Sequence, residues 1–208
     1  IFSFRNNVNE QTFAKALRAR APDVAVSVSS EVQPEFREYE RLSTTVLNAY
    51  LQPVMSRYLE TLEAGIAKRA PNASLGINQS NGGLMSVGRS REFPVRTALS
   101  GPAAGAVGAA HAARQIGRRN IITLDMGGTS ADVALIRDYK VDLAFDRDVA
   151  GFPIRMPCVD VETVGAGGGS VAWFDRDGLL KAGPKGAGAY PGPACYGRGN
   201  EQPTVMDA

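Results

Sequence analysis

Apolar side chains recur at every fourth position over the longest regular stretch of the chain, between residues 42 and 66. One stripe contains Leu42, Val46, Tyr50, Val54, Tyr58, Leu62 and Ile66, and an adjacent stripe contains Leu47, Leu51, Met55 and Leu59. This spacing predicts one long amphipathic helix, whose apolar face would normally pack on a core. Pro53 lies inside the stretch, where we expect it to bend the helix without ending it.

Shorter patterns predict the other elements. Residues 2–4 and 24–28 resemble strands on either side of a helix, which would make a β-α-β beginning. Residues 74–87 have the pattern of two short strands around a glycine turn, and residues 120–136 have that of a longer hairpin. Between them, Ser100 as N-cap, Pro102 in the first turn and Gly117 as the end predict a helix. Residues 181–199 are so rich in glycine and proline that we expect a long loop.

Composition narrows the possible classes of protein. The 208 residues are 44% hydrophobic and carry a formal net charge of +2, with acidic and basic residues interleaved, so we expect a soluble globular protein that binds neither nucleic acid nor membrane. Two cysteines fit reduced thiols in a cytoplasmic protein better than a disulfide framework. A single histidine, His111, argues against metal sites built from several imidazoles and against a Ser-His-Asp triad.

The segment "LDMGGTSADVAL", residues 124–135, carries the strongest chemical signal. Gly127 and Gly128 remove side chains from a turn, so that backbone N–H groups can approach an anion, and Thr129 and Ser130 add hydroxyl donors. Asp125 ends an apolar run that we expect to form a buried strand, where an unpaired carboxylate is costly and a Mg²⁺ ion would compensate it. Asp132 is a candidate partner of that ion. The simpler alternative is a plain hairpin in which Asp125 only initiates the turn.

A resemblance to a known family favours the first interpretation. The segments "EYERLSTTVLNAYLQPV", "QSNGGLM", "LSGPAAGAVGAA", "DMGGTSADV", "VGAGGGSVAW" and "GPACYGRG" closely resemble the hydantoinase A / 5-oxoprolinase family, which includes N-methylhydantoinase A and related subunits of ketone carboxylases. The resemblance implies an α/β fold with a ribonuclease-H-like core, as in the actin, Hsp70 and sugar-kinase superfamily, and ATP bound between two lobes. It also implies that the chain is the central, incomplete part of a longer polypeptide.

Specific site residues follow from this resemblance. Asp125 would act on metal and water, and Asp132 would be a second metal residue. ATP phosphates would be bound by the hairpin and by neighbouring backbone, at Gly127, Gly128, Thr129, Ser130, Ser100, Gly101, Gly168 and Gly169. Residues 1–90 would then end the first lobe, and residues 91–208 would form the core of the second. The family's first phosphate loop and its later adenosine-binding element have no counterpart here, so we expect the isolated chain to bind nucleotide weakly or not at all.

The activity implied by the resemblance is phosphorylation of a cyclic amide carbonyl by ATP and Mg²⁺, followed by ring-opening hydrolysis with a hydantoinase B-type partner subunit or domain. Two alternatives remain open. One is a subunit of an ATP-dependent carboxylase of acetone or acetophenone, and the other is a non-catalytic, actin-like nucleotide-binding module.

Three further clusters are weaker signals. "VGAGGGS", residues 164–170, departs from the dinucleotide-binding pattern and is at least as typical of a structural turn. "QSNGGLM", residues 79–85, could line a cleft or simply form a turn. Cys195 has no histidine nearby in the sequence, so a structural thiol is more common than a nucleophile.

Overall fold

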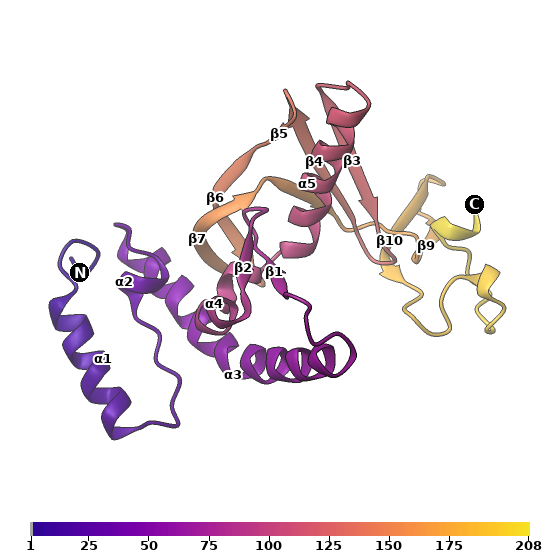
Figure 1. Cartoon of the computed structure of the whole chain (residues 1–208). Helices are drawn as coiled ribbons and strands as arrows, with labels where there is room; N and C mark the ends of the chain where they lie inside the picture. The colour runs from indigo at the N-terminus through magenta and orange to yellow at the C-terminus, as the bar shows by residue number, and fades with distance from the viewer. Residues whose placement is uncertain (1) are drawn as a thin grey trace. The chain divides into compact units, whose positions relative to one another are not determined.

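A computed structural model describes residues 2–208, and the chain forms two compact units. Unit 1 contains the described chain up to Ala104 together with Leu143–Val159, and unit 2 contains Gly105–Asp142 and Asp160–Ala208. Figure 1 shows the elements coloured along the chain. Neither unit is continuous in sequence, because the segment Leu143–Val159 leaves unit 2 to complete unit 1.

Unit 1 is mainly helical. Its helices are α1 (Val8–Arg20), α2 (Ser29–Val32), α3 (Glu38–Arg69), α4 (Val87–Glu92) and the 3-10 turn η1 (Pro94–Thr97), followed by the first turn of α5 (Ser100–Gln115). Its strands form two antiparallel hairpins, β1 (Gly76–Asn78) with β2 (Leu84–Ser86), and β6 (Leu143–Val149) with β7 (Phe152–Val159). The predicted hairpin at residues 74–87 and the predicted helix that begins at Ser100 are therefore confirmed.

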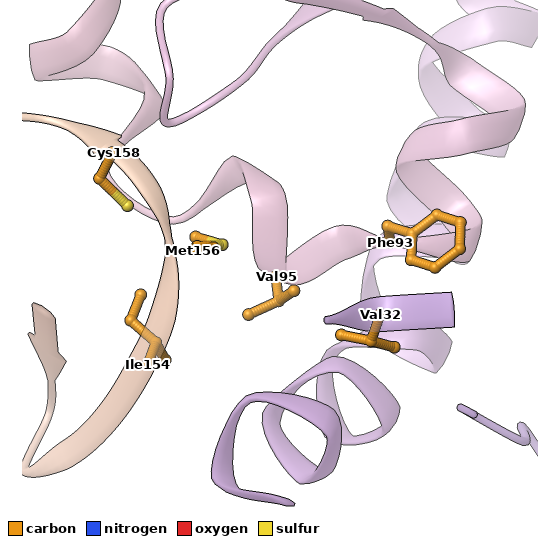
Figure 2. Packing of buried hydrophobic residues seen from close by; sticks show 6 residues of the cluster. All are labelled: Val32, Phe93, Val95, Ile154, Met156 and Cys158. Carbon is orange, nitrogen blue, oxygen red and sulfur yellow. The ribbon is translucent and has the colours of Figure 1, made fainter. Parts of the chain in front are cut away.

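The core of unit 1 is built from segments far apart in the sequence. Figure 2 shows the cluster Val32, Phe93, Val95, Ile154, Met156 and Cys158, in which alternate residues of β7 face η1 and α2. The alternation follows from the period of two along a strand, which places Ile154, Met156 and Cys158 on one face. The hairpin β6–β7 is thus part of the core that α2, α4 and η1 complete.

Helix α3 confirms the predicted long helix and continues through Pro53, but only the second predicted stripe turns inward, with Leu47, Leu51 and Met55 half-buried and Leu59 buried, while the stripe that begins at Leu42 faces solvent. The apolar stripe is exposed at most of its positions, with Tyr50 at 76%. Buried instead are Arg41, Thr44, Thr45 and Asn48, with Leu59 as the single buried aliphatic residue of the helix. Asn48 is fully buried and is held by hydrogen bonds, so polar contacts dock this helix together with Leu47, which packs on the core cluster.

The predicted strands at the beginning of the chain are wrong. Residues 2–4 form a turn in which Arg5 N donates to Phe2 O at 2.9 Å, and residues 24–28 are irregular. The helix between them is present as α1. No strand partner is available to either segment within residues 2–208, and Ser29 N and Ser30 N instead donate to the Glu10 carboxylate, both at 3.1 Å.

Unit 2 contains the rest of α5 and an antiparallel sheet. The sheet has the order β3 (Ile121–Met126), β4 (Ala131–Arg137) and β5 (Lys140–Val141), with β8 (Val161–Val164) on the free part of β4. The strands β9 (Ser170–Phe174) and β10 (Leu180–Gly186) form a separate antiparallel pair. The 3-10 turns η2 (Ala194–Tyr196) and η3 (Val205–Asp207) follow. The predicted hairpin at residues 120–136 is confirmed as β3–β4, shifted by one residue at each end.

The glycine- and proline-rich segment is partly regular. Its first residues belong to β10, where Trp173 Nε1 donates to Gly183 O at 2.6 Å. Its later part is tied to the C-terminal turn by Asp207, whose carboxylate accepts from the backbone N–H groups of Ala194, Cys195 and Thr204. The expected loop is therefore held in place by β pairing and by one carboxylate.

The architecture is a mixed α/β one in which every described strand pair is antiparallel. The predicted boundary between lobes at residues 90 and 91 differs from the division into units, and it remains a prediction about a larger fold. Within residues 2–208, no helix combines the length and apolar character that crossing a bilayer requires.

Candidate functional site

The turn between β3 and β4 forms the centre of the candidate site. Asp125 and Asp132 are opposite each other in the register of the two strands, and Met126 is opposite Ala131. Gly127 N donates to Ser130 O at 2.9 Å and closes the turn, which leaves Gly128 and Thr129 at its tip. The two carboxylates therefore lie at the base of a tight, glycine-containing bend.

The second glycine-rich segment packs directly on this bend. Gly168 N donates to Gly127 O and Gly169 N donates to Gly128 O, both at 2.8 Å. A Cβ on Gly167 would lie 2.6 Å from Gly127 O and 2.7 Å from both Thr129 N and Ser130 N. Such distances exclude any side chain at Gly167, because real Cβ atoms do not approach backbone atoms so closely. The segment thus holds the carbonyl side of the turn.

The amide side of the turn is left without internal partners. Within residues 2–208, the N–H groups of Gly128, Thr129 and Ser130 donate to no acceptor, and neither do the hydroxyls of Thr129 and Ser130. Consecutive unpaired amides on a turn form an anion-binding concavity. The Gly128 N–H and the hydroxyls of Thr129 and Ser130 can therefore be offered to phosphate oxygens, whereas Gly167 packs against the nitrogens of Thr129 and Ser130 and Gly168 and Gly169 fix the shape of the turn.

The surroundings of Asp125 differ from the prediction. The strand β3 is not buried, because Ile122 and Leu124 are 72% and 65% exposed and Asp125 itself is exposed. The prediction that Asp125 needs a cation because its charge is buried is therefore wrong. Among the described residues, the Asp125 carboxylate has no hydrogen bond and no ion pair, and a Cβ on Gly105 of α5 would lie 3.7 Å from its Oδ2. The glycine keeps the space beside the carboxylate open.

Asp132 has a defined partner. Thr163, the residue opposite it in β8, donates its hydroxyl to Asp132 Oδ1 at 2.6 Å. Asp125, Asp132 and Thr163 therefore occupy one row across three adjacent strands. Because like charges on directly opposite residues are destabilising, a cation bound between Asp125 and Asp132 would relieve their repulsion.

This donor set fits a magnesium ion that is bound mainly by a nucleotide. Within residues 2–208, no three Asp, Glu, His or Cys side chains are grouped as a metal cage. Mg²⁺ in phosphate sites commonly uses only one or two carboxylates and completes its shell with water and phosphate oxygens. Asp125, which is unpaired, and Asp132, which keeps one oxygen outside its bond with Thr163, meet that requirement.

The remaining predicted residues fall into two groups. Gly168 and Gly169 are next to the hairpin, but their N–H groups are used on its carbonyls, so they position the turn rather than donate to a phosphate. Ser100 and Gly101 lie in the first turn of α5, which belongs to unit 1, and their role stays a prediction.

The sequence patterns did not identify three residues of the site. Gly167 makes the closest approach to the turn, Gly105 faces Asp125, and Met206 N donates to Gly168 O at 2.8 Å. Gly105 belongs to a run of small residues in α5, and such a run indicates that another part of the chain can approach the helix closely. Met206 lies far from the glycine segment in sequence and has no recognisable motif around it.

Cys195 has the environment of a structural thiol. The side-chain hydrogen bond to Asp207 raises the pKa of the Cys195 thiol, with desolvation as the next cause. The same contacts, led by the Cys195 backbone N–H, hold the pKa of Asp207 well below its usual range. A thiol that donates to a carboxylate is a poor nucleophile, because the thiolate is the reactive form. Cys158 is buried, and both cysteines are free thiols.

Comparison with known proteins adds independent information. Residues 41–208 match the model of the family described as hydantoinase/oxoprolinase. The chain is 45% identical over 208 residues to the caprolactamase subunit alpha of Pseudomonas jessenii, covering 100% of this chain and 30% of the relative. The crystal structure of the ATP-dependent caprolactamase from that organism superposes with a TM-score of 0.84 at 44% identity, again over 100% of this chain and 30% of the other.

Two further relatives are named for different activities. The acetophenone carboxylase gamma subunit of Aromatoleum aromaticum is 36% identical over 100% of this chain and 29% of its own length. The 5-oxoprolinase of Saccharomyces cerevisiae is 38% identical over 88% of this chain and 14% of its own length. The chain thus spans about a third or less of the relatives that it matches. With a family model that matches most of its residues and a mixed α/β structure shared with the caprolactamase, the chain belongs to the hydantoinase/oxoprolinase family.

Proposed function

We propose that this chain is part of an ATP-dependent subunit that activates the carbonyl of a cyclic amide for ring-opening hydrolysis. Unit 2 contributes the phosphate hairpin of that subunit, and the fold around it is the ribonuclease-H-like core of the actin superfamily. The activities for which the caprolactamase and the 5-oxoprolinase are named support a cyclic amide substrate.

One observation carries the proposal. The turn at residues 127–130 presents unpaired amides and hydroxyls, and at its base an unpaired Asp125 lies opposite Asp132. Amide donors suit the oxygens of a polyphosphate, and two carboxylates suit the Mg²⁺ that accompanies it. A hairpin with a purely structural role would need neither the unpaired carboxylate nor the open space beside Gly105.

The chemistry assigned to these residues is positioning and charge stabilisation. The lactam oxygen attacks the terminal phosphorus of ATP, ADP leaves, and the ring carbon becomes more electrophilic. Water then adds to that carbon, the C–N bond opens, and inorganic phosphate is released. A bound Mg²⁺ would neutralise phosphate charge. The turn amides hold the phosphate oxygens, and Asp125 orients water and metal.

Completion of the hydrolysis is assigned to a second subunit or domain of the hydantoinase B type. The relatives support this assignment, since the caprolactamase and acetophenone carboxylase relatives are named as subunits. ATP, Mg²⁺ and this partner are therefore the components that a reconstituted activity requires.

Substitution of Asp125 tests the proposal in the full-length protein with its partner. We expect Asp125→Asn to lower the rate of substrate-stimulated ATP hydrolysis by about 100-fold or more, because the carboxylate is replaced by a neutral amide of the same shape. Asp132→Asn should lower it by about 10- to 100-fold. The matched control is Asp177→Asn, an exposed aspartate in the turn between β9 and β10, which should keep the original rate. Unchanged turnover in Asp125→Asn would refute the assigned role.

A carboxylase subunit is the second candidate, favoured by the similarity to the acetophenone carboxylase gamma subunit. The two reactions share the phosphate hairpin and differ in what receives the phosphoryl group. ATP hydrolysis stimulated by caprolactam or 5-oxoproline identifies the first function, and stimulation by a ketone with bicarbonate identifies the second. Stimulation by neither would favour a nucleotide-binding module without catalysis.

A further inference from the structure

A small polar cavity lies in unit 1, and none of its lining residues belongs to the phosphate hairpin. Its volume is about 150 Å³, and it is lined by Gln33, Gln79, Ser80, Asn81, Arg96, Met156 and Pro157. The segment "QSNGG", whose role the sequence left open between cleft lining and a plain turn, forms one wall. The cavity is below the roughly 300 Å³ of a drug-sized site, so it suits a ligand of only a few non-hydrogen atoms.

The wall formed by residues 79–81 is rigidly attached to its surroundings. Ser80, which is 2% exposed, donates its backbone N–H to Arg96 O at 2.8 Å, and Val159 N donates to Ser80 O at 2.7 Å. The Ser80 hydroxyl lies within hydrogen-bond distance of two carbonyl oxygens, Arg96 O and Ala98 O, to either of which it can donate. These bonds fix the backbone that carries Arg96 next to the loop of Gln79 and Asn81, so the cavity is preformed.

Arg96 is a partly buried cation without an anionic partner. Within residues 2–208, no carboxylate forms an ion pair with it, and its contacts are the Phe93 ring at 4.8 Å and the Val32 carbonyl at 3.5 Å. Desolvation, and next the neighbouring Arg89, lower the pKa of Arg96. The charge of Glu92 acts on the pKa of Arg96 in the opposite direction, but the Glu92 carboxylate is paired with Arg89 at 2.8 Å. A guanidinium that is partly desolvated and unpaired is stabilised by an anion.

Gln33 supplies an independent sign of a binding site. Its residue is only 7% exposed, yet its side-chain amide makes no hydrogen bond to any described residue and lines the cavity. The amide atoms of Gln33 are not among the fully buried unpaired side-chain atoms of the described residues, so they are open to the cavity and can bind a ligand inside it. Asn81 adds a second amide, whose Oδ1 accepts from Gly83 N at 2.9 Å and whose NH₂ group is unpaired.

We propose that this cavity binds a small carboxylate anion. The planar fork of Arg96 matches the two oxygens of a carboxylate, and the amides of Gln33 and Asn81 add donors. Met156 and Pro157 provide an apolar wall for the carbon that bears the carboxylate. The site does not depend on the proposed function. If that function holds, the carboxylate belongs either to a free small acid or to a lactam substrate that carries a carboxylate group.

The test measures binding by titration calorimetry without nucleotide, so its outcome is independent of ATP hydrolysis. The probes are sodium acetate and 5-oxo-L-proline, with their neutral counterparts acetamide and 2-pyrrolidinone as comparisons. We expect the anions to bind and the neutral counterparts to bind at least tenfold more weakly. Tighter binding of acetate identifies a free acid as the source of the carboxylate, and tighter binding of 5-oxo-L-proline identifies a lactam.

Two substitutions connect binding to the residues. Arg96→Gln should weaken the binding of the preferred anion at least tenfold, and Arg96→Lys should restore only part of it, because lysine keeps the charge without the fork. Arg89→Gln is the matched control, since Arg89 also lies over Phe93, at 4.1 Å, but does not line the cavity. Circular dichroism verifies the fold of each variant.

Three results would overturn the proposal. They are the absence of anion binding in the folded protein, equal binding by Arg96→Gln, and tighter binding of inorganic phosphate than of either carboxylate.

Discussion

Gly167 is the residue at which the two glycine-rich loops of unit 2 approach most closely. Its hydrogen atoms face Gly127 O, Thr129 N and Ser130 N, and the adjacent Gly168 and Gly169 bind the carbonyls of the same turn. The glycines of this segment therefore act on the hairpin through contact between backbones. A single methyl group at Gly167 would force the loops apart.

Substitution of Gly167 by alanine should destabilise the chain by about 1–3 kcal/mol, the usual cost of inserting atoms into a packed region. Gly165→Ala is a matched control, because a Cβ on Gly165 would meet no atom within 4 Å. We expect the control to change the free energy of unfolding by less than about 0.5 kcal/mol. Urea unfolding of both variants measures the difference, and equal stabilities would contradict the close contact between the loops.

At the scale of elements, helix α3 shows how polar contacts can decide which face of a helix is buried. Asn48 Nδ2 donates to Ser27 Oγ at 2.9 Å and to Glu92 O at 3.0 Å, and Asn48 Oδ1 accepts from Val95 N at 3.2 Å. On the same side, Thr44 Oγ1 accepts from Arg155 N at 2.9 Å. These bonds connect α3 to η1 and to β7, whereas the apolar stripe that contains Tyr50 faces outward.

Asn48→Ala should lower the free energy of unfolding by about 1–3 kcal/mol, because the buried Val95 N–H loses its acceptor. Tyr50→Ala, two positions along the same helix, should change it by no more than about 0.5 kcal/mol, since an exposed side chain contributes little to burial. Chemical denaturation followed by far-ultraviolet circular dichroism, which reports the helices of unit 1, compares the two variants. A larger loss from Tyr50→Ala would show that the stripe, and not Asn48, docks the helix.

At the scale of the whole molecule, the chain passes between the two units three times, at Ala104, Asp142 and Val159. The ends of the inserted hairpin β6–β7 are adjacent in unit 2, because Asp160 N donates to Asp142 O at 2.9 Å. Residues 143–159 are therefore an excursion from unit 2 that supplies Ile154, Met156 and Cys158 to the core of unit 1.

Replacement of residues 143–159 by two glycines should leave unit 2 folded and unfold unit 1. The two glycines would connect Asp142 to Asp160, which are already joined by a hydrogen bond, so unit 2 is not distorted. Unit 1, in contrast, loses half of its core cluster. Hydrogen exchange followed by mass spectrometry should show protected amides in β3, β4 and β8 and lost protection in α3.

A milder variant, Ile154→Asp, should give the same pattern, because it places an unpaired charge in the core of unit 1. Lost protection of the β3–β4 hairpin in either variant would show that the two units do not fold separately.

The family and the local elements of this protein could be predicted from its sequence. The period of the apolar positions predicted α3, Ser100 and Gly117 bounded α5 to within two residues, and the adjacent glycines located the turn after Asp125. These features depend on residues close together in the chain, so their signals are contained in short segments. The placement of Gly127 and Gly128 in a hairpin turn was predictable for the same reason.

Only the tertiary structure decided which surfaces of those elements are used. It placed Gly167 against the turn, Thr163 beside Asp132, the polar face of α3 in the interior, and Gln33 and Arg96 around one cavity. Each of these arrangements joins residues from separate parts of the chain. Its stability arises from the mutual fit of hydrogen-bond donors and acceptors, which no local periodicity encodes. Hydrophobic spacing therefore determined that α3 is a helix, and tertiary contacts, among them the hydrogen bond from Val95 N to Asn48 and the packing of Leu47 on the core, determined which of its sides is buried.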